Sequence, residues 1–182
     1  LFLKMLDHER FEPVLGLSAS TEDPSFYEPL EHYVKERRYP YSDLRIDSLS
    51  SIAPDIIFYE KPYLSVYPDR VRFPKHLNSL FCYVYYAFNS MDAVWAVDLP
   101  LFRHCWQIYM ENETVAESRR SKMWNNGRNL VVTGLPIMDK LLEQTSEDED
   151  PWPCSKGKKR IIYAPHHTIG DLHLSGIAFS TF

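Results

Sequence analysis

Two adjacent histidines are the residues of this chain best suited to acid–base chemistry. His166 and His167 follow Pro165 at the end of the apolar run 161–164, which predicts a buried strand. Imidazole exchanges protons near neutral pH and can hydrogen-bond a phosphate. Loops that follow strands often carry the ligand-contacting groups of α/β proteins. The pattern indicates a catalytic or phosphate-binding role, and the alternative is that one histidine caps a turn while the other is exposed.

A metal site built on these histidines is the weaker interpretation. Adjacent side chains on extended backbone point to opposite faces, so His166 and His167 would rarely hold one ion together. His173 could add a third ligand, but the spacing matches no zinc pattern. We therefore expect no metal at this position.

Tyrosines accompany two other apolar runs. The run 56–59 is followed by a charged and aromatic loop that includes Tyr63, and the run 79–88 contains Tyr85 and Tyr86. Phenols can donate hydrogen bonds to an acceptor molecule, although aromatic residues in a strand more often belong to the core. A solvated turn is the alternative for the loop that carries Tyr63.

A single glycine follows another apolar run in the segment "VVTGLP". Gly134 could let backbone amides approach a phosphate, but a tight turn is the simpler role. The sequence contains no GxGxxG, GxxxxGK[ST] or GxSxG motif. It therefore lacks the signatures of a P-loop ATPase, a dinucleotide-binding enzyme and a serine hydrolase.

The elements that must position these residues alternate between strand and helix patterns. Buried strands are predicted within 11–20, 56–59, 79–88, 107–110 and 129–133, and helices within 21–39, 99–106, 113–124 and 136–144. This alternation predicts an α/β fold with a doubly wound parallel sheet, in which ligands bind beyond the carboxyl ends of the strands.

Composition restricts the compartment and the partners. The chain has 182 residues, 45% of them hydrophobic, and a net charge of −5 without a basic stripe, so we expect no nucleic-acid partner. Its 3 cysteines show no CxxC spacing, which favours a reducing, cytoplasmic compartment. No apolar stretch is long enough to span a bilayer, and association with a membrane surface stays open.

A charged, proline-containing segment divides the chain. Residues 145–158 interrupt the alternation, so we expect a first domain at 1–150 and, at 151–182, a linker with the start of a second domain. The chain opens in what resembles the second half of an amphipathic helix and ends after an apolar stretch. We therefore expect it to be a piece of a longer protein, with the first strand of its first domain missing.

Four segments in one order carry a resemblance to a known family. "PDIIFYEKPY", "FCYVYYAFN", "NLVVTGLPIMDKLL" and "KRIIYAPHHTI" with a trailing "GIAFSTF" resemble the CDP-glycerol glycerophosphotransferase family of bacterial surface-polysaccharide biosynthesis. The similarity covers most of residues 10–182, and "TGLPIMD" with "YAPHHTI" is its most specific part. It implies two Rossmann-like domains of GT-B type, with 1–150 as the acceptor-side domain and 151–182 as the start of the nucleotide-side domain.

The resemblance implies transfer of a polyol phosphate from a CDP-linked donor to a glycan or lipid-linked acceptor, without a cofactor. It assigns His166 and His167 as catalytic and Tyr63, Tyr86 and Thr168 as substrate-binding. Tyr86 stands where teichoic-acid polymerases of the family have a histidine base, and an ordinary tyrosine is a poor base at neutral pH. A glycosyltransferase that uses a nucleotide sugar, or a non-catalytic binding domain, therefore remains an alternative.

Overall fold

The computed structural model describes residues 2–18, 25, 27–72, 78–88, 97–142, 157, 159 and 161. The chain divides into two compact units, residues 1–144 and 145–182. The fold that follows is that of the first unit.

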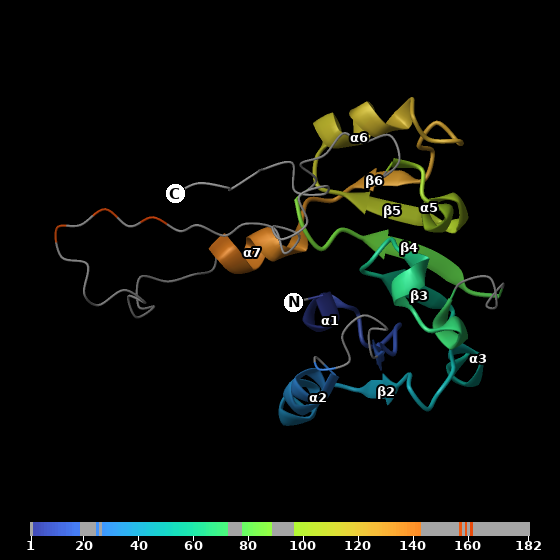
Figure 1. Ribbon diagram of the computed structural model, residues 1–182, viewed down its shortest axis with the longest axis vertical. Coiled ribbons are helices and arrows are strands. Elements are labelled where there is room, and N and C mark those ends of the chain that lie inside the picture. Colours follow the sequence, from blue (N-terminus) through green and yellow to red (C-terminus); the bar gives the residue numbers. More distant parts are fainter. Residues whose placement is uncertain are drawn as a thin grey trace, which may run out of the picture. The chain divides into compact units, whose positions relative to one another are not determined.

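A parallel four-stranded sheet forms the centre of this unit (Figure 1). Its strands are β3 (Ile56–Tyr59), β4 (Leu80–Val84), β5 (Gln107–Met110) and β6 (Leu130–Val132), in the order β3-β4-β5-β6. In register, Tyr59 lies opposite Tyr83, and Tyr83 lies opposite Ile108. Because all pairs are parallel, the loops that follow the four strands leave from one edge of the sheet.

A smaller βαβ unit precedes this sheet. Strands β1 (Leu15–Leu17) and β2 (Tyr41–Asp43) pair in parallel, and helix α2 (Tyr27–Glu36) connects them. Leu17, Tyr27 and Val34 form its buried cluster. Pro29 lies in the first turn of α2, where its missing N–H costs no intrahelical hydrogen bond.

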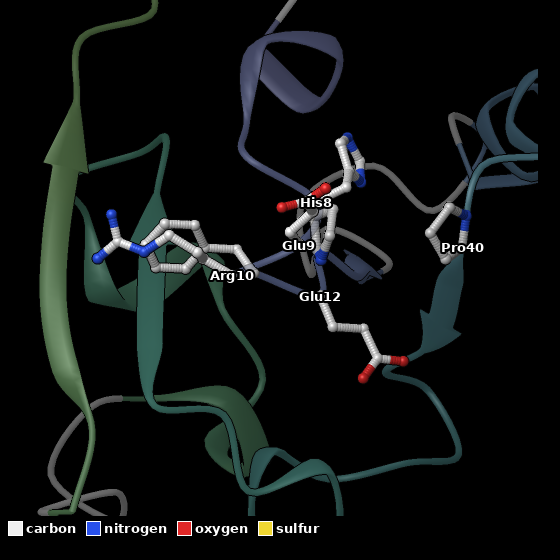
Figure 2. Close-up of a pocket in the computed structure, with 7 residues that line it drawn as sticks. His8, Glu9, Arg10, Glu12 and Pro40 are labelled. Atoms are coloured by element: carbon white, nitrogen blue, oxygen red, sulfur yellow. The ribbon is translucent and has the colours of Figure 1, made fainter.

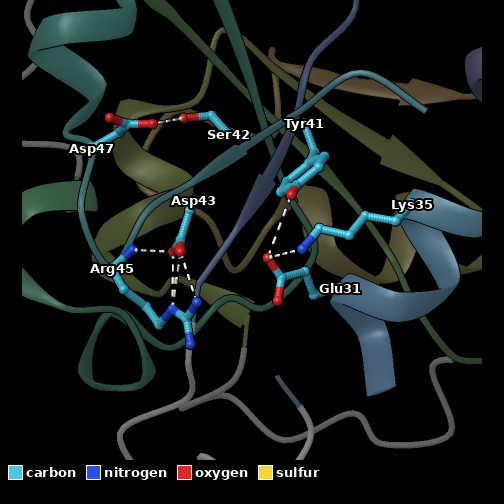
Figure 3. Close-up of polar contacts among 7 residues, drawn as sticks. All are labelled: Glu31, Lys35, Tyr41, Ser42, Asp43, Arg45 and Asp47. Carbon is cyan, nitrogen blue, oxygen red and sulfur yellow. Dashed lines mark hydrogen bonds and ion pairs between the residues drawn. The ribbon is translucent and has the colours of Figure 1, made fainter. Parts of the chain in front are cut away.

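Polar contacts fasten the strand β2 (Figure 3). The Tyr41 hydroxyl donates to Glu31 Oε1 at 3.3 Å, and Lys35 pairs with the same carboxylate at 2.9 Å. Directly after β2, the Arg45 guanidinium bonds Asp43 through both Nε and Nη2, the shorter contact being 2.7 Å. These pairs hold the ends of β2 against its helix and its following turn.

Short helices complete the unit, and capping groups explain where several begin. They are α1 (Phe2–Met5), α3 (Leu49–Ile52), η2 (Leu64–Val66), η3 (Asp69–Val71), α5 (Pro100–His104), α6 (Glu113–Arg120) and α7 (Pro136–Leu142). Ser48 and Ser51 form a capping box at α3, and the Asn112 side chain accepts from Val115 N at the start of α6. Pro100 occupies the first turn of α5, where its fixed φ suits a helix. None of the described helices is long and apolar enough to cross a bilayer.

The main core lies on one face of the four-stranded sheet. Side chains of that face, including Phe81, Tyr83 and Ile108, pack with Leu101 and Phe102 of α5. Ala116 of α6, Met123 and Leu130 belong to the same cluster. On the opposite face the rings of Phe58 and Tyr109 stack with centroids 6.1 Å apart.

The predicted α/β fold with a Rossmann-like parallel sheet is confirmed. The strands expected within 56–59, 79–88, 107–110 and 129–133 are all present and pair with their sequence neighbours. The strand expected within 11–20 is the three-residue β1, which pairs with a strand, β2, that was not predicted. The two-domain GT-B arrangement and the boundary at 150 stay predictions.

Candidate functional site

The carboxyl edge of the four-stranded sheet gathers tyrosines from two strand ends. Tyr63 lies in the loop after β3, and Tyr85 and Tyr86 directly follow β4. Tyr63 is 41% exposed and Tyr86 is 55% exposed, so both phenol rings are accessible to a ligand. Partial burial raises the pKa of Tyr86, and the nearby Tyr63 raises it further. Tyr86 therefore keeps its proton at neutral pH and can donate a hydrogen bond, but it cannot serve as a general base.

Hydrogen bonds fix the loop that carries Tyr63. The buried Tyr59 hydroxyl donates to Val71 O at 2.7 Å. The Tyr67 hydroxyl accepts from Lys61 N at 3.0 Å and donates to Lys61 O at 3.2 Å. Burial raises the pKa of Tyr67 to about 12, so these bonds persist at neutral pH. The backbone two residues before Tyr63 is thereby held in place.

A buried aromatic layer supports the same edge from inside. The rings of Tyr83 and Tyr85 meet edge to face with centroids 4.7 Å apart, and Phe102 lies 5.1 Å from Tyr83. The Tyr83 hydroxyl is buried and has no hydrogen-bond partner among the described residues. Burial, together with Tyr85 and Tyr86, raises the pKa of Tyr83 far above its ordinary value.

Arg119 is a functional candidate that the sequence analysis missed. Its Nη1 donates to the Tyr85 hydroxyl at 2.7 Å, and its guanidinium carbon lies 5.3 Å from the centre of the Tyr85 ring. The residue is only 3% exposed. The sequence carried no signal for it, because Arg119 and Arg120 are adjacent arginines that only the packing of α6 distinguishes.

The segment between β6 and α7 has a structural role. Gly134 has a φ of +91°, a conformation that favours glycine. The amides of Thr133 and Gly134 both donate to Met110 O, at 3.0 and 3.2 Å. The Gly134 amide is therefore engaged with the end of β5, and the positive φ gives this glycine a structural role.

The predicted site residues fall into two groups. Tyr63 and Tyr86 come together at the carboxyl edge, as the parallel-sheet argument expected. His166, His167 and Thr168 lie outside the described residues, so their assignment stays a prediction. Within the described part of the chain, no group of three or more histidine, cysteine, aspartate or glutamate side chains could hold a metal ion.

A second candidate site is a pocket of about 530 Å³ in the small βαβ unit, near the amino ends of β1 and β2 (Figure 2). Residues 8–13 and Pro40 line it, and Leu15 N donates to Pro40 O at the amino ends of β1 and β2. Figure 2 shows the charged groups of Arg10 and Glu12 pointing away from each other. The charges that line this pocket are of both signs and do not converge on one point. The pocket also lies at the amino ends of the strands, whereas ligands of α/β proteins bind at the carboxyl ends. We therefore consider it a poorer ligand site.

Comparisons with known proteins add no identification. No protein family, curated protein or solved structure matches this chain.

Proposed function

We propose that this chain contributes the acceptor side of a transferase of bacterial surface-polysaccharide biosynthesis. The enzyme moves a glycerol-phosphate-like unit from a CDP-activated donor to a glycan or lipid-linked acceptor. One observation carries the proposal. Three of the segments that carry the family resemblance, described over 54–63, 81–88 and 129–142, contain strands that end at one carboxyl edge of the sheet. Tyr63 and Tyr86 are exposed together at that edge.

The reaction requires a base for the acceptor hydroxyl and hydrogen-bond donors for the phosphate. An acceptor hydroxyl attacks the distal phosphorus of the donor, a new P–O bond forms, and the P–O bond to CMP breaks. The hydroxyl proton passes to a base, and donors around the phosphate stabilise the developing charge. Tyr63 and Tyr86 bind the acceptor through phenol hydrogen bonds and ring contacts. Of His166 and His167, one accepts the proton from the acceptor hydroxyl, and the other donates a hydrogen bond to the phosphate.

Release of CMP or UDP tests this proposal. The full-length protein that contains this chain is incubated with CDP-glycerol, CDP-ribitol or a UDP-sugar, each with and without a glycan acceptor. We expect acceptor-dependent CMP release from a CDP-linked donor and no UDP release from the UDP-sugar, whereas residues 1–182 alone should be inactive. Replacing both His166 and His167 by alanine should slow the reaction at least tenfold, about 1.4 kcal/mol in barrier. The matched control His32→Ala, on the exposed surface of α2, should leave the rate unchanged.

Two results would contradict this assignment. An unchanged rate in the double variant would remove both histidines from the site. Failure to turn over or bind any CDP- or UDP-linked donor would reject the transferase itself. Turnover of a UDP-sugar alone would favour the glycosyltransferase alternative.

A non-catalytic binding domain is the second candidate function. The observation that favours it is the raised pKa of Tyr86, because this residue stands where the family has a histidine base and cannot replace that base. Such a domain would recognise a polysaccharide through the same edge. Saturable glycan binding by a protein that turns over no donor would support this candidate.

In this proposal the protein acts in the cytoplasm, and contact with the inner membrane surface would bring it to a lipid-linked acceptor.

A further inference from the structure

The amino edge of the four-stranded sheet, opposite the candidate site, carries two exposed tryptophans. The chain enters β5 from α5, and it enters β6 from the loop after α6, at this edge (Figure 1). Trp106 directly precedes β5 and is 50% exposed, and Trp124 lies in the loop before β6 and is 60% exposed. Among the described residues, neither indole forms a ring contact or a hydrogen bond. Both aromatic faces and both indole N–H donors are therefore available to a ligand.

A pair of asparagines joins the loops that carry these tryptophans. Asn129 Nδ2 donates to Cys105 O, next to Trp106, at 2.9 Å. Asn125, next to Trp124, donates through Nδ2 to Asn129 Oδ1 at 2.9 Å. The loops are thus fixed to each other before any ligand binds, which lowers the entropy cost of binding. Exposed apolar side chains that gather in one region mark interaction sites, whereas scattered single ones need no explanation.

The same two loops bring positive charge to this edge. The segments 99–110 and 118–131 contain 5 arginine and lysine residues and no aspartate or glutamate, although the whole chain has a net charge of −5. Arg103 and Arg120 pair with carboxylates of other segments, at 2.6 and 3.2 Å. Arg128, in the loop before β6, is exposed and forms no ion pair among the described residues. Its charge favours an anionic partner.

A sugar chain fits this surface better than a protein does. A stable protein interface buries about 800 Å² on each side around a continuous apolar centre, whereas here asparagines lie between the loops of the two indoles. A second copy fits least, because a two-fold interface would place two Arg128 charges on the same patch. A sugar ring presents apolar C–H groups on its faces and hydroxyls at its rim, so it suits indoles that alternate with polar side chains.

We propose that Trp106, Trp124 and Arg128 bind an anionic glycan chain at the amino edge of the sheet. The indoles pack on the C–H faces of sugar rings, and Arg128 pairs with an acidic group of the chain. The inference rests on the proposed function in taking a surface polysaccharide as the polymer that the protein handles. It adds a second contact with that polymer, remote from the carboxyl edge. Such a contact raises the effective concentration of the chain end at the candidate site.

Calorimetric titration of the full-length protein with polygalacturonate tests the inference, at pH 7 and constant ionic strength. We expect saturable binding. Neutral dextran should bind about fivefold more weakly, and polyglutamate, which has the charge but no sugar rings, about tenfold more weakly. Trp106→Ala and Trp124→Ala should each raise the Kd for polygalacturonate about tenfold, because each removes one ring contact. Arg128→Gln should raise it about threefold and leave the Kd for dextran unchanged.

A matched pair of control substitutions lies on α2. Tyr33 is 46% exposed, and the Arg37 guanidinium carbon lies 4.0 Å from the centre of its ring. Tyr33→Ala and Arg37→Gln remove an exposed aromatic ring and an exposed cation from another surface, so neither should change the Kd. If Trp106→Ala does not fold, Trp124→Ala decides the question, because the exposed side chain of Trp124 lies in a loop outside the strands.

Four outcomes would overturn the inference: no saturable binding of polygalacturonate, equal affinity for polyglutamate, equal affinity for dextran, or a Kd that Trp124→Ala leaves unchanged. Self-association that Trp124→Ala abolishes would also overturn it, since the surface would then be a protein interface. The fate of the proposed function is separate. Turnover of a CDP-linked donor without glycan binding at Trp124 rejects this inference and keeps the transferase. Glycan binding that depends on Trp124, without turnover of any donor, supports this inference and rejects the transferase.

Discussion

The same chemical change at two paired tyrosines should have opposite effects on stability. Tyr59 and Tyr83 lie opposite each other in the register of β3 and β4, and they are 5% and 0% exposed. The Tyr59 hydroxyl donates to Val71 O at 2.7 Å, whereas the Tyr83 hydroxyl has no partner among the described residues. A Tyr→Phe substitution removes only the oxygen and keeps the ring, so it isolates this difference.

The expected magnitudes follow from the hydrogen-bonding state of each hydroxyl. Tyr59→Phe leaves the Val71 carbonyl without its donor, which should lower the free energy of unfolding by about 1–2 kcal/mol. Tyr83→Phe removes an unsatisfied buried hydroxyl while the rings of Tyr85 and Phe102 stay at 4.7 and 5.1 Å, so it should raise that free energy by about 1–2 kcal/mol. The two variants should therefore differ by about 2–4 kcal/mol.

Urea unfolding at pH 7, followed by circular dichroism at 222 nm, measures both free energies. Burial raises the pKa of both phenols, so neither ionises at this pH and charge does not complicate the comparison. In thermal unfolding each kcal/mol should appear as a shift of about 2–4 °C in Tm for a chain of this size. If Tyr83→Phe destabilises the protein as much as Tyr59→Phe does, the Tyr83 hydroxyl is satisfied in solution and the argument fails.

Two further predictions concern glycine conformation and pH. Gly134→Ala should cost about 1–2 kcal/mol from the φ of +91° alone, because an added Cβ meets nothing within 4 Å. Gly127→Ala should lower the free energy of unfolding more than Gly134→Ala does, since the φ of Gly127 is +63° and an added Cβ would also lie 3.1 Å from the Arg120 Cα. Equal urea midpoints for the two variants would contradict this. Arg45 holds the pKa of Asp43 well below its usual range, so Asp43 stabilises the fold above about pH 4 and loses this effect as the pH falls further. Asp43→Asn should therefore lower stability at pH 7 and flatten its acid dependence; an unchanged slope in stability between pH 2 and 5 would reject that role.

The strands of the large sheet were predictable because their sequences are short apolar runs that end at turn residues. Ile56–Tyr59 follows Pro54, and Leu130–Val132 precedes Gly134, so composition alone placed both strands in the chain. The strand β2 was missed because Tyr41–Asp43 is polar and only half-buried, and its pairing with β1 comes from tertiary contacts.

The candidate site was predictable only at the level of the sheet edge. Parallel strands fix the side on which Tyr63 and Tyr86 emerge, and this follows from the alternation of elements. The bond between Arg119 and Tyr85 joins residues 34 positions apart, and no local pattern specifies such a pair. The inward orientation of a charged side chain depends on how α6 packs, because Arg119 and Arg120 are chemically identical in the sequence and occupy opposite environments.

The strand order β3-β4-β5-β6 has a consequence for how the protein is made. Each of β4, β5 and β6 pairs with the strand synthesised just before it, so every new pairing closes a loop of only a few tens of residues at a small entropic cost. Low sequence separation between contacting residues favours fast folding. The sheet can therefore form strand by strand as the polypeptide leaves the ribosome. The backbone groups of β3 can pair as soon as β4 has been synthesised.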